Sequence, residues 1–122
     1  MDTAILIVDD AKFARNLLLR ALQNGGYTNI TQACCAAEAR AVFEQGQPDL
    51  TLLDITLPDS NDLSLLTDLL KMRPQAKIVM NSAIGQELII ADALGLGARD
   101  FITKPFAEQD LLAVVANVLA EE

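Results

Sequence analysis

The chain alternates five times between a short apolar run and a segment whose apolar residues recur at helical spacing. The first run, Thr3 to Val8, is rich in β-branched residues and is typical of a strand that is buried on both faces. From Phe13 onward, apolar residues recur every three or four positions until Gly25-Gly26 ends the helix. This alternation predicts a parallel sheet with helices on both faces, and right-handed crossovers leave few topologies for it.

The same pattern continues to the last residues of the chain. The other predicted strands are residues 29–34, 49–53, 77–81 and 100–103, and the other predicted helices are 36–44, 63–70, 86–94 and 111–119. Gly95 and Gly97 are expected to close the fourth helix. A chain of 122 residues has the size of one ordinary domain. We therefore expect a single α/β domain over residues 1–122, built on a doubly wound five-stranded sheet.

Ionisable or hydroxyl side chains stand where four of the five apolar runs end. Asp9 and Asp10 follow the first run directly, and Asp54 follows the third. Ser82 follows the fourth run, and Lys104 follows the fifth. In open parallel sheets the ligand crevice lies beyond the carboxyl ends of the strands. The sequence therefore predicts one pocket that holds three carboxylates, a hydroxyl group and an ammonium group.

These groups suit the chemistry of a divalent cation and a phosphoryl group. Three neighbouring carboxylates repel one another, so a cation is needed to hold them together at neutral pH. Mg²⁺ binds one or two carboxylates and accepts a phosphate oxygen as a further ligand, which assigns Asp9 and Asp10 to the metal. Lys104 suits a phosphoryl oxygen, and Asp54 is then free to act as a nucleophile that forms an aspartyl phosphate. Each feature is common when taken alone, and only the combination carries this hypothesis.

Four segments give the chain a clear resemblance to a known family. They are Val8-Asp9-Asp10, Asp54-Ile55-Thr56-Leu57-Pro58, Ser82-Ala83 and the stretch from Gly97 to Phe106. Over essentially its whole length the chain resembles response-regulator receiver domains. The resemblance implies a flavodoxin-like fold with strand order 2-1-3-4-5.

The resemblance also implies a signalling function. A sensor histidine kinase would phosphorylate Asp54, with Mg²⁺ held additionally by the backbone carbonyl of Thr56. Ser82 would then turn inward, and Phe101, a position that is often Tyr in the family, would change rotamer. The face built from the fourth helix, the last strand and the last helix would change for a downstream protein. The Lys104-Pro105 bond is expected to be cis, which the sterics of X-Pro bonds permit.

Some positions depart from the common pattern of the family or vary within it. Asp62 stands where Gly is usual, and it follows Asn61, which suits a helix cap. Thr56, Ala83 and Ile84 occupy positions that are expected to modulate how water reaches and hydrolyses the phosphoryl group. We predict that Ile84 shields this group and slows its loss.

The residues leave two branches of the family open. Residues 8–15 and 82–86 are similar to stand-alone CheY-like regulators of chemotaxis, and the chain starts and ends close to the expected domain. The alternative is a receiver cut from a larger regulator with a DNA-binding or enzymatic output domain.

Two other classes of function compete with a phosphorylated receiver. A Mg²⁺-dependent phosphohydrolase would need an acid two residues after its nucleophile, where this chain has Thr56. A receiver-like docking module that is never phosphorylated would not need the full set of acids together with Lys104. We therefore expect no enzymatic activity beyond the domain's own phosphorylation and dephosphorylation.

Charge and residue types limit the kinds of binding partner and the cellular compartment that we expect for this protein. The formal net charge of −8 argues against direct binding of nucleic acid, which needs a basic surface. The chain contains neither a bilayer-spanning run nor a leader sequence, so we expect a cytoplasmic protein. We also expect a monomer or weak dimer. Without any His, a Cys/His metal site is not supported. Cys34 and Cys35 are expected to be buried, reduced thiols at a strand end.

Overall fold

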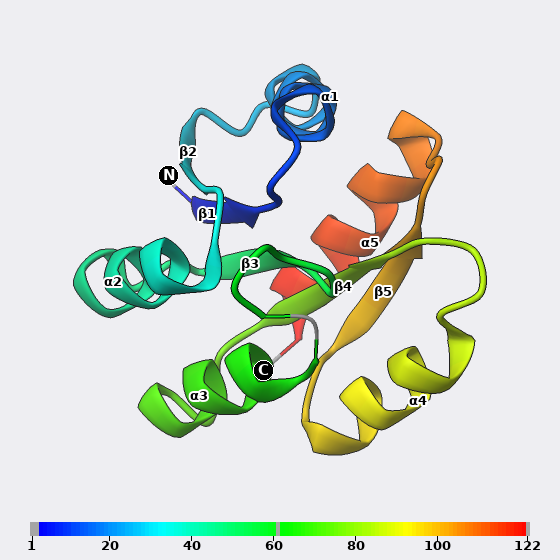
Figure 1. Cartoon of the computed structure of the whole chain (residues 1–122). Coiled ribbons are helices and arrows are strands. Elements are labelled where there is room, and N and C mark those ends of the chain that lie inside the picture. Colours follow the sequence, from blue (N-terminus) through cyan, green and yellow to red (C-terminus); the bar gives the residue numbers. More distant parts are fainter. Residues whose placement is uncertain (1–2, 61, 122) are drawn as a thin grey trace.

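The computed structural model describes residues 3–60 and 62–121, and these residues form one five-stranded parallel sheet flanked by helices (Figure 1). The strand order is β2-β1-β3-β4-β5, which confirms the predicted α/β class and strand order. The strands are β1 (Ala4–Val8), β2 (Asn29–Ala33), β3 (Leu50–Asp54), β4 (Ile78–Ser82) and β5 (Asp100–Thr103). The cap predicted at Asn61 lies outside the described residues.

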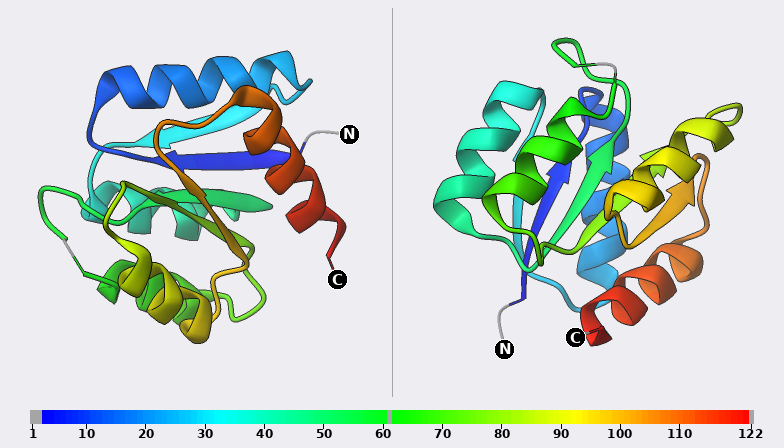
Figure 2. Two further views of the ribbon diagram at one scale, coloured as in Figure 1. Left: turned by 90° about the vertical axis from the view of Figure 1, so that its right-hand side faces the viewer. Right: turned by 90° about the horizontal axis from the view of Figure 1, so that it is seen from below.

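Helices cover both faces of the sheet (Figure 2). They are α1 (Lys12–Asn24), α2 (Ala36–Gly46), α3 (Ser64–Met72), α4 (Glu87–Leu96) and α5 (Glu108–Ala120). Successive side chains of a strand point to opposite faces, so Ile5 and Ile7 pack with α1 and α5, whereas Leu6 and Val8 pack on the other side with α2 and α3. This burial on both faces explains why β1 is apolar at every position.

The fourth helix ends at Leu96 and is capped by Gly97, and the prediction that Gly95 would help to close it was wrong. Gly95 lies inside α4. Gly97 has φ +127°, a backbone conformation that favours glycine. The N–H of Ala98 donates to Ala93 O at 3.0 Å and the N–H of Gly97 donates to Leu94 O at 3.2 Å, which is the Schellman arrangement. The helix therefore stops where the left-handed residue can satisfy its last carbonyl groups.

The register of the strands places the predicted site at the carboxyl ends of the strands. Val8 pairs with Leu53, and Asp54 pairs with Asn81. Ser82 pairs with Thr103 at the end of β5. The residues that follow these positions therefore leave the sheet side by side.

The two cysteines differ from their prediction. Cys34 is exposed and Cys35 is half-buried, so the expected burial was wrong. The reason is that β2 is an edge strand, and its end leads directly into the surface loop before α2. Both thiols are free within the described part of the chain.

Among the described residues, no helix combines the length and the apolar character that a membrane span requires.

Candidate functional site

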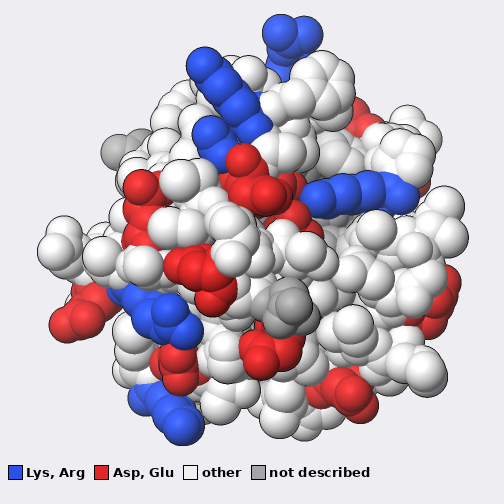
Figure 3. All heavy atoms as spheres, viewed as in Figure 1, with Lys and Arg blue, Asp and Glu red and all other residues white. Residues whose placement is uncertain are grey.

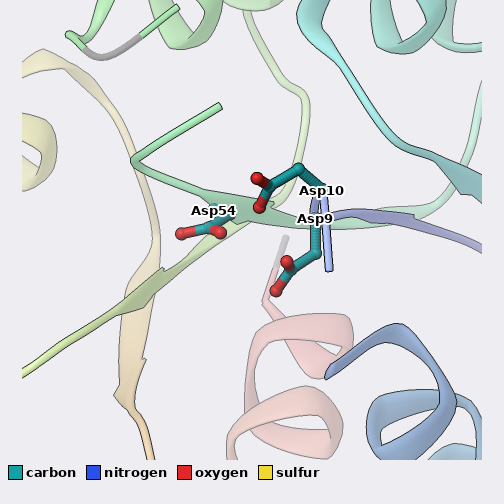
Figure 4. A group of neighbouring side chains, drawn as sticks. All are labelled: Asp9, Asp10 and Asp54. Atoms are coloured by element: carbon teal, nitrogen blue, oxygen red, sulfur yellow. The ribbon is translucent and has the colours of Figure 1, made fainter. Parts of the chain in front are cut away.

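Three carboxylates meet at the carboxyl ends of β1 and β3 (Figure 4). Asp9, Asp10 and Asp54 each offer one oxygen, and these three oxygens all lie within 4.8 Å of one another. Asp9 is completely buried and Asp54 is nearly so, whereas Asp10 is exposed. One oxygen of Asp9 accepts the N–H of Ala11 at 2.9 Å. Oxygen ligands at this spacing could hold a hard divalent cation such as Mg²⁺.

Lys104 brings a positive charge from the end of β5 into the same cluster. Its Nζ lies 3.0 Å from Asp9 Oδ2 and 3.2 Å from Asp54 Oδ2. Its backbone N–H donates to Ser82 O at 2.7 Å, and the Lys104-Pro105 bond that follows is cis. The structure thus joins β1, β3 and β5 through a single ammonium group.

The pocket changes the acidity of its own groups. Burial raises the pKa of Asp54 above its ordinary value, and the charge of Asp9 adds to this, while the Lys104 ammonium opposes it. Burial tends to lower the pKa of Lys104, but its hydrogen bond to Asp9 and the charge of Asp54 outweigh this, so the net shift is upward. The pocket therefore keeps a charged lysine beside a carboxylate that is more basic than an ordinary aspartate.

The other predicted residues lie on β5 and at or just after the ends of β3 and β4. Ser82 is buried, and its hydroxyl donates to Ile102 O at 3.3 Å, toward β5. The backbone N–H of Thr56 donates to Asp54 Oδ1 at 3.4 Å. Ala83 and Ile84 are exposed in the loop after β4, and the Phe101 side chain is partly exposed on β5.

The space-filling view shows how charged side chains are distributed over one face of the molecule. Acidic atoms are visible near the middle of the face in Figure 3, with basic side chains above and beside them. Because Asp10 is exposed, the carboxylate cluster can be reached by small ions from solvent.

Sequence reasoning missed several residues that support the site. Asp59 accepts the N–H groups of Ala36 and Ala37 at 2.7 and 3.0 Å, which ties the loop after β3 to the start of α2. Arg15 donates to the carbonyl of Asp9 at 2.7 Å. Asp59 stood out in the sequence only as a turn former, because nothing local indicates a partner more than twenty residues away.

Comparisons with known proteins agree with this geometry. The family model described as "Response regulator receiver domain" matches residues 5–116. The chain is similar to the chemotaxis protein CheY of Thermotoga maritima, with 38% identity over 118 residues that cover 97% of this chain and 98% of the relative. It is also similar to the crystal structure of the receiver domain of NtrX from Brucella abortus, with a TM-score of 0.91, 34% identity, and coverage of 97% and 99%.

A further relative is much longer than this chain. The DNA-binding transcriptional regulator NtrC of a Bradyrhizobium species is 33% identical over 118 residues. The match covers 97% of this chain but only 24% of that regulator.

Proposed function

Because the chain belongs to the response regulator receiver domain family, we propose that Asp54 accepts a phosphoryl group from a sensor histidine kinase with the help of Mg²⁺. The observation that carries this proposal is the Lys104 ammonium, 3.2 Å from Asp54 Oδ2 in a pocket with two further carboxylates. Such an arrangement is better suited to stabilising the negative charge of phosphoryl oxygens during transfer than to protein stability alone.

The transfer would use groups that already lie together. An oxygen of Asp54 forms a bond to phosphorus while the bond between phosphorus and the imidazole nitrogen of the kinase breaks, and the imidazole keeps the electron pair. Lys104 binds a phosphoryl oxygen and stabilises its negative charge. Asp9, Asp10, Asp54 and the backbone carbonyl of Thr56 would hold Mg²⁺, which supplies further charge stabilisation for the phosphoryl oxygens.

Phosphorylation would be read out on the face formed by α4, β5 and α5. A phosphoryl group adds roughly two negative charges and new hydrogen-bond acceptors, which would draw the Ser82 hydroxyl away from Ile102 O. Ser82 and Phe101 line one cavity of about 250 Å³ between β5 and α4, so a change at Ser82 alters the packing around Phe101. The population shift can be no larger than the difference in interaction energy between the two states.

Apolar residues on α4 support a protein partner at this face. Leu88 is 84% exposed and Leu96 is 52% exposed, although α4 buries Ile90 and Ala93. These side chains offer apolar surface that a protein partner could bury.

The similarity to CheY, which covers 98% of that relative, supports a stand-alone chemotaxis regulator. We further propose that residues 1–122 form its receiver domain and that the protein is cytoplasmic and monomeric or weakly dimeric. The similarity to NtrC supports the alternative of a receiver that belongs to a longer regulator with a DNA-binding output domain. In either case the domain's own phosphorylation and dephosphorylation are its proposed chemistry, and nucleic acid is not its direct ligand.

Intact-mass analysis after incubation with acetyl phosphate and Mg²⁺ tests the phosphorylation site. We expect one phosphate on the wild type and on Asp92→Asn, which changes an exposed aspartate of α4, and none on Asp54→Asn. An unmodified wild type, or equal modification of Asp54→Asn, would refute the proposal.

A further inference from the structure

The loop between β4 and α4 is closed by the side chain of Gln86. The backbone N–H of Gln86 donates to Ala83 O at 3.3 Å, and Gly85 has φ +96°, as the third residue of a type II turn requires. The side chain then turns back, and its Oε1 accepts the N–H of Ala83 at 2.7 Å. The four residues from Ala83 to Gln86 are thus held by hydrogen bonds in both directions.

The other end of the same amide reaches the loop that follows Asp54. Gln86 Nε2 donates to Thr56 Oγ1 at 3.4 Å, and the N–H of Thr56 donates to Asp54 Oδ1. Asp54 pairs with Asn81 in the sheet, so the two loops begin at neighbouring positions. Gln86 therefore links the two loops that flank the phosphoryl acceptor.

The exposure of Gln86 distinguishes it from its neighbours. Gln86 is half-buried, whereas Ala83, Ile84, Glu87 and Leu88 are exposed. Its amide is directed to Ala83 and Thr56 rather than to the first turn of α4, while its backbone carbonyl accepts the N–H of Ile90. The helix can therefore begin without this side chain, and its amide is used for the link between loops.

We propose that Gln86 is a positioning residue whose amide latches the two loops in the resting arrangement and opposes the phosphorylated one. This inference rests on the proposed function of Asp54. A phosphoryl group brings acceptor oxygens that compete for donors, and movement of Ser82 toward them also moves Ala83, the next residue in the chain. The N–H of Ala83 points to Gln86 Oε1 at rest, so a displacement of Ala83 weakens that bond. The latch thus sets how readily the pocket responds to a phosphoryl group.

Titration with beryllofluoride in the presence of Mg²⁺ tests the latch in the full chain. Gln86→Leu keeps the volume of the side chain but removes its amide, and we expect roughly three- to ten-fold tighter binding of beryllofluoride, the range that one hydrogen bond provides. Gln45→Leu is the matched control, because Gln45 is exposed near the far end of α2. Affinity that is unchanged or weaker in Gln86→Leu would overturn the latch.

A double-mutant cycle tests whether Gln86 acts through Thr56. Thr56→Val removes the acceptor Oγ1 and keeps the shape of the side chain. If the two residues form one latch, the double variant gains less than the product of the two single gains. Independent, multiplicative effects would overturn the coupling between the two loops.

Amide hydrogen exchange gives a readout that does not depend on phosphorylation. We expect the Ala83 amide to exchange faster in Gln86→Leu than in the wild type without any phosphoryl analogue, since its acceptor is gone. Equal exchange would overturn the inference. A wild type that does not respond to beryllofluoride refutes the proposed function as well, whereas a responsive wild type with an unaltered Gln86→Leu variant refutes the latch alone.

Discussion

Lys104 offsets the negative charge of the acidic pocket. Its ammonium contacts Asp9, which is completely buried, and Asp54, which is nearly so. Lys104→Met should lower the free energy of unfolding by about 1–2 kcal/mol. This is less than the loss expected for a fully buried pair, since the Lys104 side chain is 31% exposed and therefore partly screened. Added Mg²⁺ should restore part of the loss by supplying another cation.

Urea unfolding with and without Mg²⁺ measures both effects for Lys104. Lys71→Met, which removes an exposed lysine of α3, is the control and should change stability little. Wild-type stability of Lys104→Met in the absence of Mg²⁺ would contradict the assigned role.

Ile84 is a second residue whose effect can be measured directly. Ile84 is 80% exposed and follows Ser82 by two positions in the chain, and we predict that it shields the phosphoryl group from water. Ile84→Asn or Ile84→Glu should speed the loss of phosphate severalfold, because a polar side chain can orient the attacking water. Leu88→Asn alters a similarly exposed apolar residue on α4 and should leave the rate unchanged, which a time course of phosphate release can check.

Among the elements, α4 contains Gly95 and is capped by Gly97, and these two glycines should respond oppositely to the same substitution. A Cβ on Gly97 would be strained by its φ of +127° and would lie 3.1 Å from Leu70 Cδ1, so Gly97→Ala should cost about 1–3 kcal/mol. A Cβ on Gly95 would meet no described atom within 4 Å, so Gly95→Ala should stabilise the helix by about 0.5–1 kcal/mol. Thermal unfolding of the two variants measures the difference, and equal effects would contradict it.

The start of α2 depends on a carboxylate from another element. The N–H groups of Ala36 and Ala37 hold the pKa of Asp59 below its ordinary value of 3.8, because they stabilise the charged form. The stabilisation is therefore present above pH 3.8 and disappears as the pH falls through the lowered pKa. Asp59→Ala should unfold at a lower temperature than the wild type near neutral pH, and the gap should narrow in acid. A gap that is independent of pH would show that the charge of Asp59 does not matter, and Asp59→Asn provides the neutral comparison.

For the whole molecule, Mg²⁺ should couple the site to global stability. A cation that binds only the folded chain stabilises it by about 1.4 kcal/mol when its concentration is tenfold above Kd. We expect the melting temperature to rise with Mg²⁺ in the wild type and to rise less in Asp10→Asn, which removes the exposed carboxylate of the proposed metal site without disturbing the core. Calorimetry across a Mg²⁺ series measures this, and an equal rise in both proteins would remove Asp10 from the metal site.

The sequence by itself determined the class of the fold and showed that the site lies at the carboxyl ends of the strands. Periodicity and the residues that end each apolar run are local properties, so Asp9, Asp10, Asp54, Ser82 and Lys104 could be assigned to strand ends directly. The order of the strands is not local, and it came from the resemblance to a family rather than from the spacing of residues.

Only the tertiary structure decided which side chains touch. The 3.0 Å contact between Lys104 and Asp9, and the links from Gln86 to Thr56 and from Asp59 to α2, join residues far apart in the chain. The exposure of Cys34 likewise depends on the place of β2 at the edge of the sheet. These features depend on the directions of side chains and on the packing of elements, which no local pattern of residues specifies.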